Sequence, residues 1–247
     1  MRIRIPHALF LASAAAAGAA IVMPALGQDL PATRIVSTAK ATPDRSGTPS
    51  DPRGVAITAQ AKLIVPPDLE APIVTGLDIQ VAKGLSWNGE KYTKCTQAAL
   101  ERRGPSGCPP ASIIGSATAT GMADTVHAVV SVVFVNGPGG HKFAYASLNN
   151  PARVRETIVI NSPKPTGTWG HRESLSIPRS LQIVAGVPLR LTAVTMRIGG
   201  KSYAKKYITS TSCPAGGWKY AVTAHYLYDG TGQTTDDVGT GSIPCTK

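Results

Sequence analysis

Four cysteines are the side chains of this sequence best suited to chemistry, since a thiol can bind metal, attack a substrate or form a disulfide. No two of them form a Cys-x-x-Cys pair, and no histidine stands at ligand spacing from any of them, which argues against a zinc site. No setting that would lower a thiol pKa is evident. An even number of cysteines behind a leader sequence instead favours disulfides. The four are Cys95, Cys108, Cys213 and Cys245.

The pairing of these cysteines has three possible solutions, of which the sequence favours the local one. Between Cys95 and Cys108, "TQAALERRGPSG" holds a threonine that can cap a short helix, followed by a Gly-Pro pair that would end it. A compact excursion of this kind would bring its two ends together. We therefore expect one short helix inside a Cys95–Cys108 loop, and a second bridge between Cys213 and Cys245.

Catalytic motifs are not found in the sequence. It has no Gly-x-Ser-x-Gly nucleophile elbow and no His-Glu-x-x-His zinc motif, and Thr195 replaces the first glycine of a phosphate-binding loop in "TAVTMRIGGKSY". A glycosidase needs two carboxylates facing each other across a cleft. Glu156 is one candidate without an evident partner, and His225 is best explained as a hydrogen-bonded strand residue. We expect no catalytic, cofactor-binding or metal-binding residues.

A turn-rich segment near residue 230 raises the question of calcium. The stretch "DGTGQTTDD" contains Asp229, Asp236 and Asp237, and calcium prefers carboxylate and carbonyl oxygens. The segment does not match a helix–loop–helix calcium motif, and turns of this composition are ordinary. The sequence leaves calcium binding at Asp229–Asp237 open.

Two of the three tryptophans stand in segments typical of loops. Trp87 lies in "SWNGEKY" and Trp169 in "GTWGH". Loop aromatics beside polar groups can stack on sugars or anchor a partner, whereas an aromatic folded onto the rim of the domain would only pack. We take Trp87 and Trp169 as candidate ligand contacts, with rim packing as the alternative. Trp218 follows "CPAGG" and is expected to pack beside the second disulfide.

Strands must position these residues, because period-two alternation of apolar and polar side chains dominates the chain from residue 54 onward. "GVAITAQAK" and "LDIQVAK" alternate in this way, and "VHAVVSVVFVNG" is apolar on both faces, which places it in a sheet centre covered on both sides. Three segments are expected to be irregular: "GLSWNGEKY", residues 163–181 and residues 229–241. With ten to twelve strands separated by turns, we expect an all-β antiparallel β-sandwich, immunoglobulin-like or jelly-roll-like.

The first 27 residues have the layout of a secretory signal peptide. Arg2 and Arg4 precede an alanine-rich apolar stretch, and small residues stand before the predicted cleavage site. Residues 28–53 form a Pro/Ser/Thr-rich N-terminal segment, and residues 54–247 form the sandwich domain. Cleavage would lower the net charge from +11 to +9 by removing the two arginines. We expect a secreted, extracellular protein associated with the cell wall.

Positive charge is scattered along the chain rather than gathered in a run, so a nucleic-acid partner is not expected. A cationic exported protein is attracted to anionic surfaces. We therefore expect an anionic cell-wall polymer or a membrane surface as partner, or another exported protein bound through an exposed sheet face. The sequence does not define the oligomeric state.

Two motifs carry a resemblance to known proteins. "KYTKCTQAALERRGPSGCPPASIIGSA" and "YITSTSCPAGGWKYAVTAHYLYDG" resemble patterns in uncharacterised secreted actinobacterial proteins with paired Cys-Pro motifs, a family of unknown function. The resemblance implies an exported, disulfide-tied β protein and brings no catalytic residues. We expect a non-enzymatic structural or binding role at the cell envelope. The alternative is an extracellular hydrolase acting on polysaccharide or ester bonds.

Overall fold

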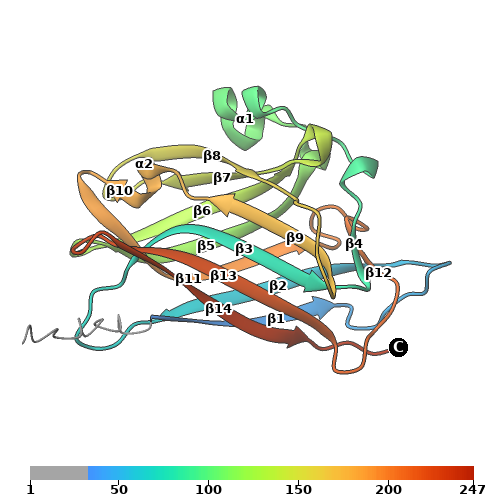
Figure 1. The fold of residues 1–247 in the computed structure, drawn as a ribbon. Helices are drawn as coiled ribbons and strands as arrows, with labels where there is room; N and C mark the ends of the chain where they lie inside the picture. The colour runs from blue at the N-terminus through green and yellow to red at the C-terminus, as the bar shows by residue number, and fades with distance from the viewer. Residues whose placement is uncertain (1–32) are drawn as a thin grey trace, which may run out of the picture. The chain divides into compact units, whose positions relative to one another are not determined.

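Antiparallel strands make up most of the described chain in the computed structural model, which describes residues 33–247. The predicted leader, residues 1–27, lies outside these described residues. Fourteen strands form two sheets that lie face to face (Figure 1). The predicted all-β antiparallel sandwich is therefore confirmed.

The larger sheet has ten strands. Its main path runs β4-β12-β2-β11-β5-β6-β7-β8, with β1 also paired to β2 and β10 to β11. The strands are β1 (Arg34–Thr42), β2 (Arg53–Ile64), β4 (Leu85–Trp87), β5 (Ile113–Ala123), β6 (Val126–Asn136), β7 (Lys142–Leu148), β8 (Val154–Ile160), β10 (Ile183–Val184), β11 (Val187–Gly199) and β12 (Ile208–Ser210).

The smaller sheet has four strands in the order β14-β13-β3-β9. β13 and β14 form a long hairpin, paired from Trp218–Ile243 to Tyr228–Gln233. The strands are β3 (Ile73–Ala82), β9 (Trp169–Ser176), β13 (Trp218–Tyr228) and β14 (Gln233–Ile243).

The two sheets meet along both lateral edges. On one side β1 lies against β14, where the Ile35 N–H donates to Asp237 Oδ2 at 2.6 Å. A Cβ added to Gly239 would lie 2.7 Å from the Ile35 carbonyl oxygen, so this approach needs glycine. On the other side Asn161 and Ser174 exchange two backbone hydrogen bonds of 2.9 Å, which joins the end of β8 to β9. Contact along both sides shields the edge strands from pairing with other chains.

The Cys95–Cys108 disulfide is formed and encloses α1 (Gln97–Arg103), whose first turn Thr96 caps as predicted. This excursion covers the outer face of β6, β7 and β8, as the placement of α1 in Figure 1 shows. Leu100 of α1 is fully buried there, together with Val135 and Phe143. β6 is thus covered on both faces only in its second half, because Val129 in its first half remains 44% exposed.

The second predicted disulfide is also formed and links Cys213, before β13, to Cys245, after β14. Trp218 is fully buried, and its ring N–H donates to the Ser212 carbonyl at 2.8 Å. Its place beside this disulfide therefore agrees with the expectation. The remaining helical turns are α2 (Arg179–Gln182), η1 (Gly89–Lys91), η2 (Gly104–Gly107), η3 (Pro110–Ser112) and η4 (Pro138–Gly140).

The three segments expected to be irregular each contain a strand. β4 ends at Trp87, β9 begins at Trp169 within residues 163–181, and β14 crosses residues 229–241. The apolar alternation that normally marks a strand is interrupted there by the buried Glu173 in β9 and by glycines in β14. In residues 33–247 no helix is long and apolar enough to cross a bilayer.

Candidate functional site

An apolar cavity of about 280 Å³ lies between the two sheets. It is lined by residues of both sheets and extends along most of the space between them. An engineered apolar cavity of about 150 Å³ in another protein is enough to bind benzene. The space inside this sandwich is therefore large enough for an apolar molecule bigger than benzene.

Small side chains create this space. Sheets packed face to face stand about 10 Å apart, and a methyl group cannot fill its share of that distance. The larger sheet turns alanines inward on four strands, two of them in each of β2, β5 and β7. The inward alanines are Ala39, Ala59, Ala61, Ala117, Ala119, Ala144 and Ala146.

Large aliphatic side chains facing inward are only half-buried, which is unusual for the interior of a sandwich. Ile79, Leu175 and Val222 on the smaller sheet show this, as do Val194 and Met196 on β11. Their exposed area faces the cavity that they line, because their strands alternate with outward polar residues. The interior is therefore less tightly packed than a protein core normally is.

A charged cluster stands in one wall of the cavity. Lys142, at the start of β7, and Glu173, in β9, both line it and are only 8% and 9% exposed. Lys142 Nζ lies 2.6 Å from Glu173 Oε1, and His171 donates to the same oxygen. Ser162, which is exposed, donates to Glu173 Oε2 at 3.1 Å and accepts from Lys142 at 2.8 Å. The cluster therefore connects the cavity wall to the surface.

The charges of this cluster balance. Burial alone would raise the pKa of Glu173, but the hydrogen bond from His171 and the charge of Lys142 outweigh it and hold that pKa below its usual value. The carboxylate is therefore ionised at neutral pH. Lys142 supplies the compensating positive charge at hydrogen-bonding distance.

Two aromatic side chains complete this part of the wall. Trp87 lines the cavity and stacks on His171, with ring centroids 3.8 Å apart and planes 8° apart. Tyr207 lines it too, is fully buried, and has no hydrogen-bond partner for its hydroxyl among the described residues. Burial raises the pKa of Tyr207, and the negative charge of Glu173 raises it further. This hydroxyl is therefore a neutral donor.

The cluster does not have the order of a hydrolase triad. Such a triad places the histidine between the serine and the acid, so that the histidine can take the serine proton. Here the Glu173 carboxylate stands between Ser162 and His171. Lys142 also contacts Ser162, but as an ammonium group paired with Glu173 it donates rather than accepts. The contacts hold charge in place and do not activate a nucleophile.

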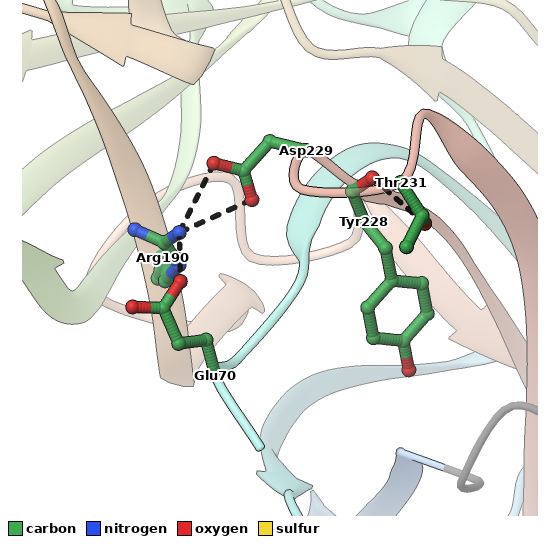
Figure 2. Close-up of polar contacts among 5 residues, drawn as sticks. All are labelled: Glu70, Arg190, Tyr228, Asp229 and Thr231. Atoms are coloured by element: carbon green, nitrogen blue, oxygen red, sulfur yellow. Dashed lines mark hydrogen bonds and ion pairs between the residues drawn. The ribbon is translucent and has the colours of Figure 1, made fainter.

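A second polar cluster ties together two loops (Figure 2). Arg190 of β11 contacts Glu70, in the β2–β3 loop, at 2.6 Å and both oxygens of Asp229, in the β13–β14 turn, at 3.1 Å. Thr231 donates to the Tyr228 carbonyl within that turn. The Arg190 side chain is 16% exposed but that of Glu70 is 82% exposed. We interpret this cluster as structural, because Arg190 holds the β2–β3 loop and the β13–β14 turn together.

The three aspartates considered for calcium do not converge. Asp229 pairs with Arg190, Asp236 accepts from His225 at 2.7 Å, and Asp237 accepts from the backbone of β1. Within residues 33–247 no group of three His, Cys, Asp or Glu side chains is arranged to hold a metal ion. Each aspartate has a protein partner of its own, so the geometry does not support a calcium site at Asp229–Asp237.

The other residues singled out from the sequence lie apart from the cavity wall. His225 stands on the outer face of the smaller sheet between Asp236 and Asp78, and Glu156 accepts from Ser180. Trp169 begins β9 and pairs with Ala82 beyond a shift of register next to His171, so it does not share the inward face of His171 and Glu173. Of the two candidate ligand contacts, Trp87 lines the cavity and Trp169 does not.

The cavity itself was missed by sequence reasoning. A signal was present, because two alanines stand two positions apart in "AQA" (59–61), "ATA" (117–119) and "AYA" (144–146). Alanine at inward positions of several neighbouring strands indicates an underfilled interior. Lys142, Glu173 and Tyr207 carry no local motif, since they come from three distant parts of the chain.

Comparison with protein-family models, curated proteins and solved structures finds no match to this chain.

Proposed function

We propose that this chain is an exported binding protein that takes up an apolar small molecule between its two sheets. The observation that carries the proposal is the intersheet cavity of about 280 Å³. Binding sites for small molecules are typically apolar cavities with a few placed polar groups. Lys142, Glu173 and Trp87 supply such groups at one place in the wall.

Export is supported by the two disulfides, because such bonds persist in oxidising compartments. A role at the cell envelope is supported by the net charge, which is +11 over the whole chain and +9 without the expected leader. A hollow of about 530 Å³ beside Cys213 gathers part of that charge, since Arg45, Arg53 and Lys247 line it together with one acidic residue, Asp51. Attraction to anionic polymer or lipid would bring the protein close to envelope molecules, and such attraction weakens as salt increases.

The test uses N-phenyl-1-naphthylamine, an uncharged apolar dye whose fluorescence rises in an apolar site. Wild-type protein is expected to bind it in a saturable way. Ala119→Leu, which fills part of the cavity from β5, should weaken binding by about tenfold if the added side chain removes roughly 1.4 kcal/mol of binding energy. Thr118→Leu is the matched control, because the neighbouring Thr118 is exposed on the outer face.

Two results would contradict the proposal. One is the absence of saturable dye binding by folded wild-type protein. The other is equal loss of binding in Ala119→Leu and Thr118→Leu, which would place the dye on the outer surface.

A further inference from the structure

We infer that the cavity selects an uncharged amphiphile, an apolar chain carrying a hydroxyl, ester or ketone group, over a fatty-acid anion of the same length. This inference rests on the proposed function. The features that carry it are the buried Lys142–Glu173 ion pair and the unpartnered hydroxyl of Tyr207, which lines the same cavity.

The ion pair leaves no free positive charge for an anionic ligand. Lys142 Nζ already faces Glu173 Oε1 at 2.6 Å, and both side chains are about nine-tenths buried. A ligand carboxylate placed beside this pair would add a second negative charge to the wall. Burying a charge without a partner is costly, so the ionised acid is disfavoured.

Hydrogen-bond donors, in contrast, remain unused. An ammonium group has three donor hydrogens. Lys142 has two partners among the described residues, Ser162 and Glu173, so one of its three hydrogens is left for a ligand. The buried Tyr207 hydroxyl has no partner there. An uncharged oxygen on the ligand satisfies such a donor without adding charge.

The remaining lining accommodates the apolar chain of the ligand. The wall away from the cluster consists mainly of alanine and branched aliphatic side chains from both sheets. Trp87 stands between the two environments, since it lines the cavity and stacks on His171 of the cluster. A molecule with one polar end therefore matches this wall better than a hydrocarbon or a sugar does.

The experiment measures displacement of N-phenyl-1-naphthylamine from the full chain by decan-1-ol and by decanoate, at about pH 8, where a carboxyl group is fully ionised. Decanol is expected to displace the dye at a concentration about tenfold or more below that of decanoate. At about pH 5 the displacing concentrations of the two compounds should lie closer together, because part of the decanoate is then protonated and uncharged. This second measurement needs no variant.

Glu173→Gln reverses the charge balance and is the sharper test. Glutamine can still accept a hydrogen bond, but it leaves Lys142 positive and unpaired. Decanoate should now compete at least as well as decanol, and it should raise the melting temperature of this variant more than that of the wild type. Circular dichroism checks that the variant is folded.

Each outcome has one meaning. Absence of saturable dye binding by folded wild-type protein overturns the proposed function. Dye binding with equal or better displacement by decanoate at about pH 8 overturns only the inference of an uncharged ligand. If Glu173→Gln does not fold, the wild-type comparison of the two pH values decides.

Discussion

Buried tyrosine hydroxyls in this sandwich are of two kinds. The Tyr220 hydroxyl donates to the Ser37 carbonyl at 2.9 Å, across the seam between the two sheets. The Tyr207 hydroxyl has no partner in the described chain, although its side chain is fully buried. Leaving a buried donor unpaired costs free energy, whereas a satisfied one contributes to stability. The two side chains should therefore respond in opposite ways to removal of the hydroxyl.

Tyr207→Phe is expected to leave the free energy of unfolding unchanged or raise it by up to about 1 kcal/mol. Tyr220→Phe is expected to lower it by about 1 kcal/mol, because the Ser37 carbonyl loses its donor. Urea denaturation of both variants measures the difference. Equal destabilisation by the two substitutions would show that Tyr207 has a partner in the folded protein.

Glu173 makes the stability of the fold sensitive to acid. Its pKa in the folded protein lies below the usual value of 4.5, mainly through His171 and Lys142, which overcome the opposing effect of burial. The stabilisation is therefore complete above the unfolded-state pKa and is lost as the pH falls through the lower, folded-state value. Asp78, held by Ser174 and Arg172 against the effect of burial, acts in the same direction.

Glu173→Gln should melt at a lower temperature than wild type at neutral pH, because Lys142 loses its counter-charge. Its melting temperature should also fall less steeply than that of wild type as the pH drops below about 4. Thermal melts across this pH range provide the measurement, with Asp78→Asn as a second carboxylate for comparison. Parallel pH profiles of the melting temperature for wild type and Glu173→Gln would contradict the assignment of acid sensitivity to Glu173.

At the scale of elements, two strands show why sequence prediction of this fold was incomplete. Strands with apolar alternation, such as β2 and β3, were predicted from that alternation. β9 places His171 and Glu173 on its inward face. The buried charge of Glu173 is compensated by Lys142, which is distant in the sequence but close in space. β14 has glycine at 239 and 241, where Ile35 and Tyr220 approach too closely for any side chain. Neither cause is visible in the local sequence.

Gly239→Val should open the seam between β1 and β14. Its Cβ would lie 2.7 Å from the Ile35 carbonyl oxygen, and backbone cannot move aside as a flexible side chain can. We expect a loss of about 1–3 kcal/mol in the free energy of unfolding, with faster hydrogen exchange at the Ile35 amide. Gly230→Val is the control, since nothing lies within 4 Å of its Cβ position. If the two variants were equally stable, β1 and β14 would not be in tight contact at Gly239.

The two disulfides stabilise different parts of the fold. Replacing both Cys95 and Cys108 by serine frees a loop of sequence separation 13, and we expect a loss of about 3 kcal/mol. The same change at Cys213 and Cys245, with separation 32, should cost up to about 1 kcal/mol more. Only the first pair should expose the outer face of β6 and increase binding of an apolar surface dye, because α1 covers that face. Denaturation curves and dye titrations distinguish the two.

At the scale of the whole molecule, the proposed function depends on a space that no single strand encloses. Alanines from the larger sheet, aliphatic side chains from the smaller one and contact along both lateral edges together form the cavity. The sequence predicted the sandwich and both disulfides because these follow from alternation and cysteine spacing. It did not predict the cavity or its charged cluster, because these arise where residues far apart in the chain face each other across two sheets.

The central claim is that a small molecule binds inside the sandwich, and the methyl groups of its alanines report on this most directly. The measurement is a titration of alanine-methyl-labelled protein with decan-1-ol, followed by nuclear magnetic resonance. We predict shifts at Ala119 and Ala146, which line the cavity, and none at Ala98, which is exposed on α1. Unchanged inner alanine signals, whether or not Ala98 shifts, would contradict binding between the sheets.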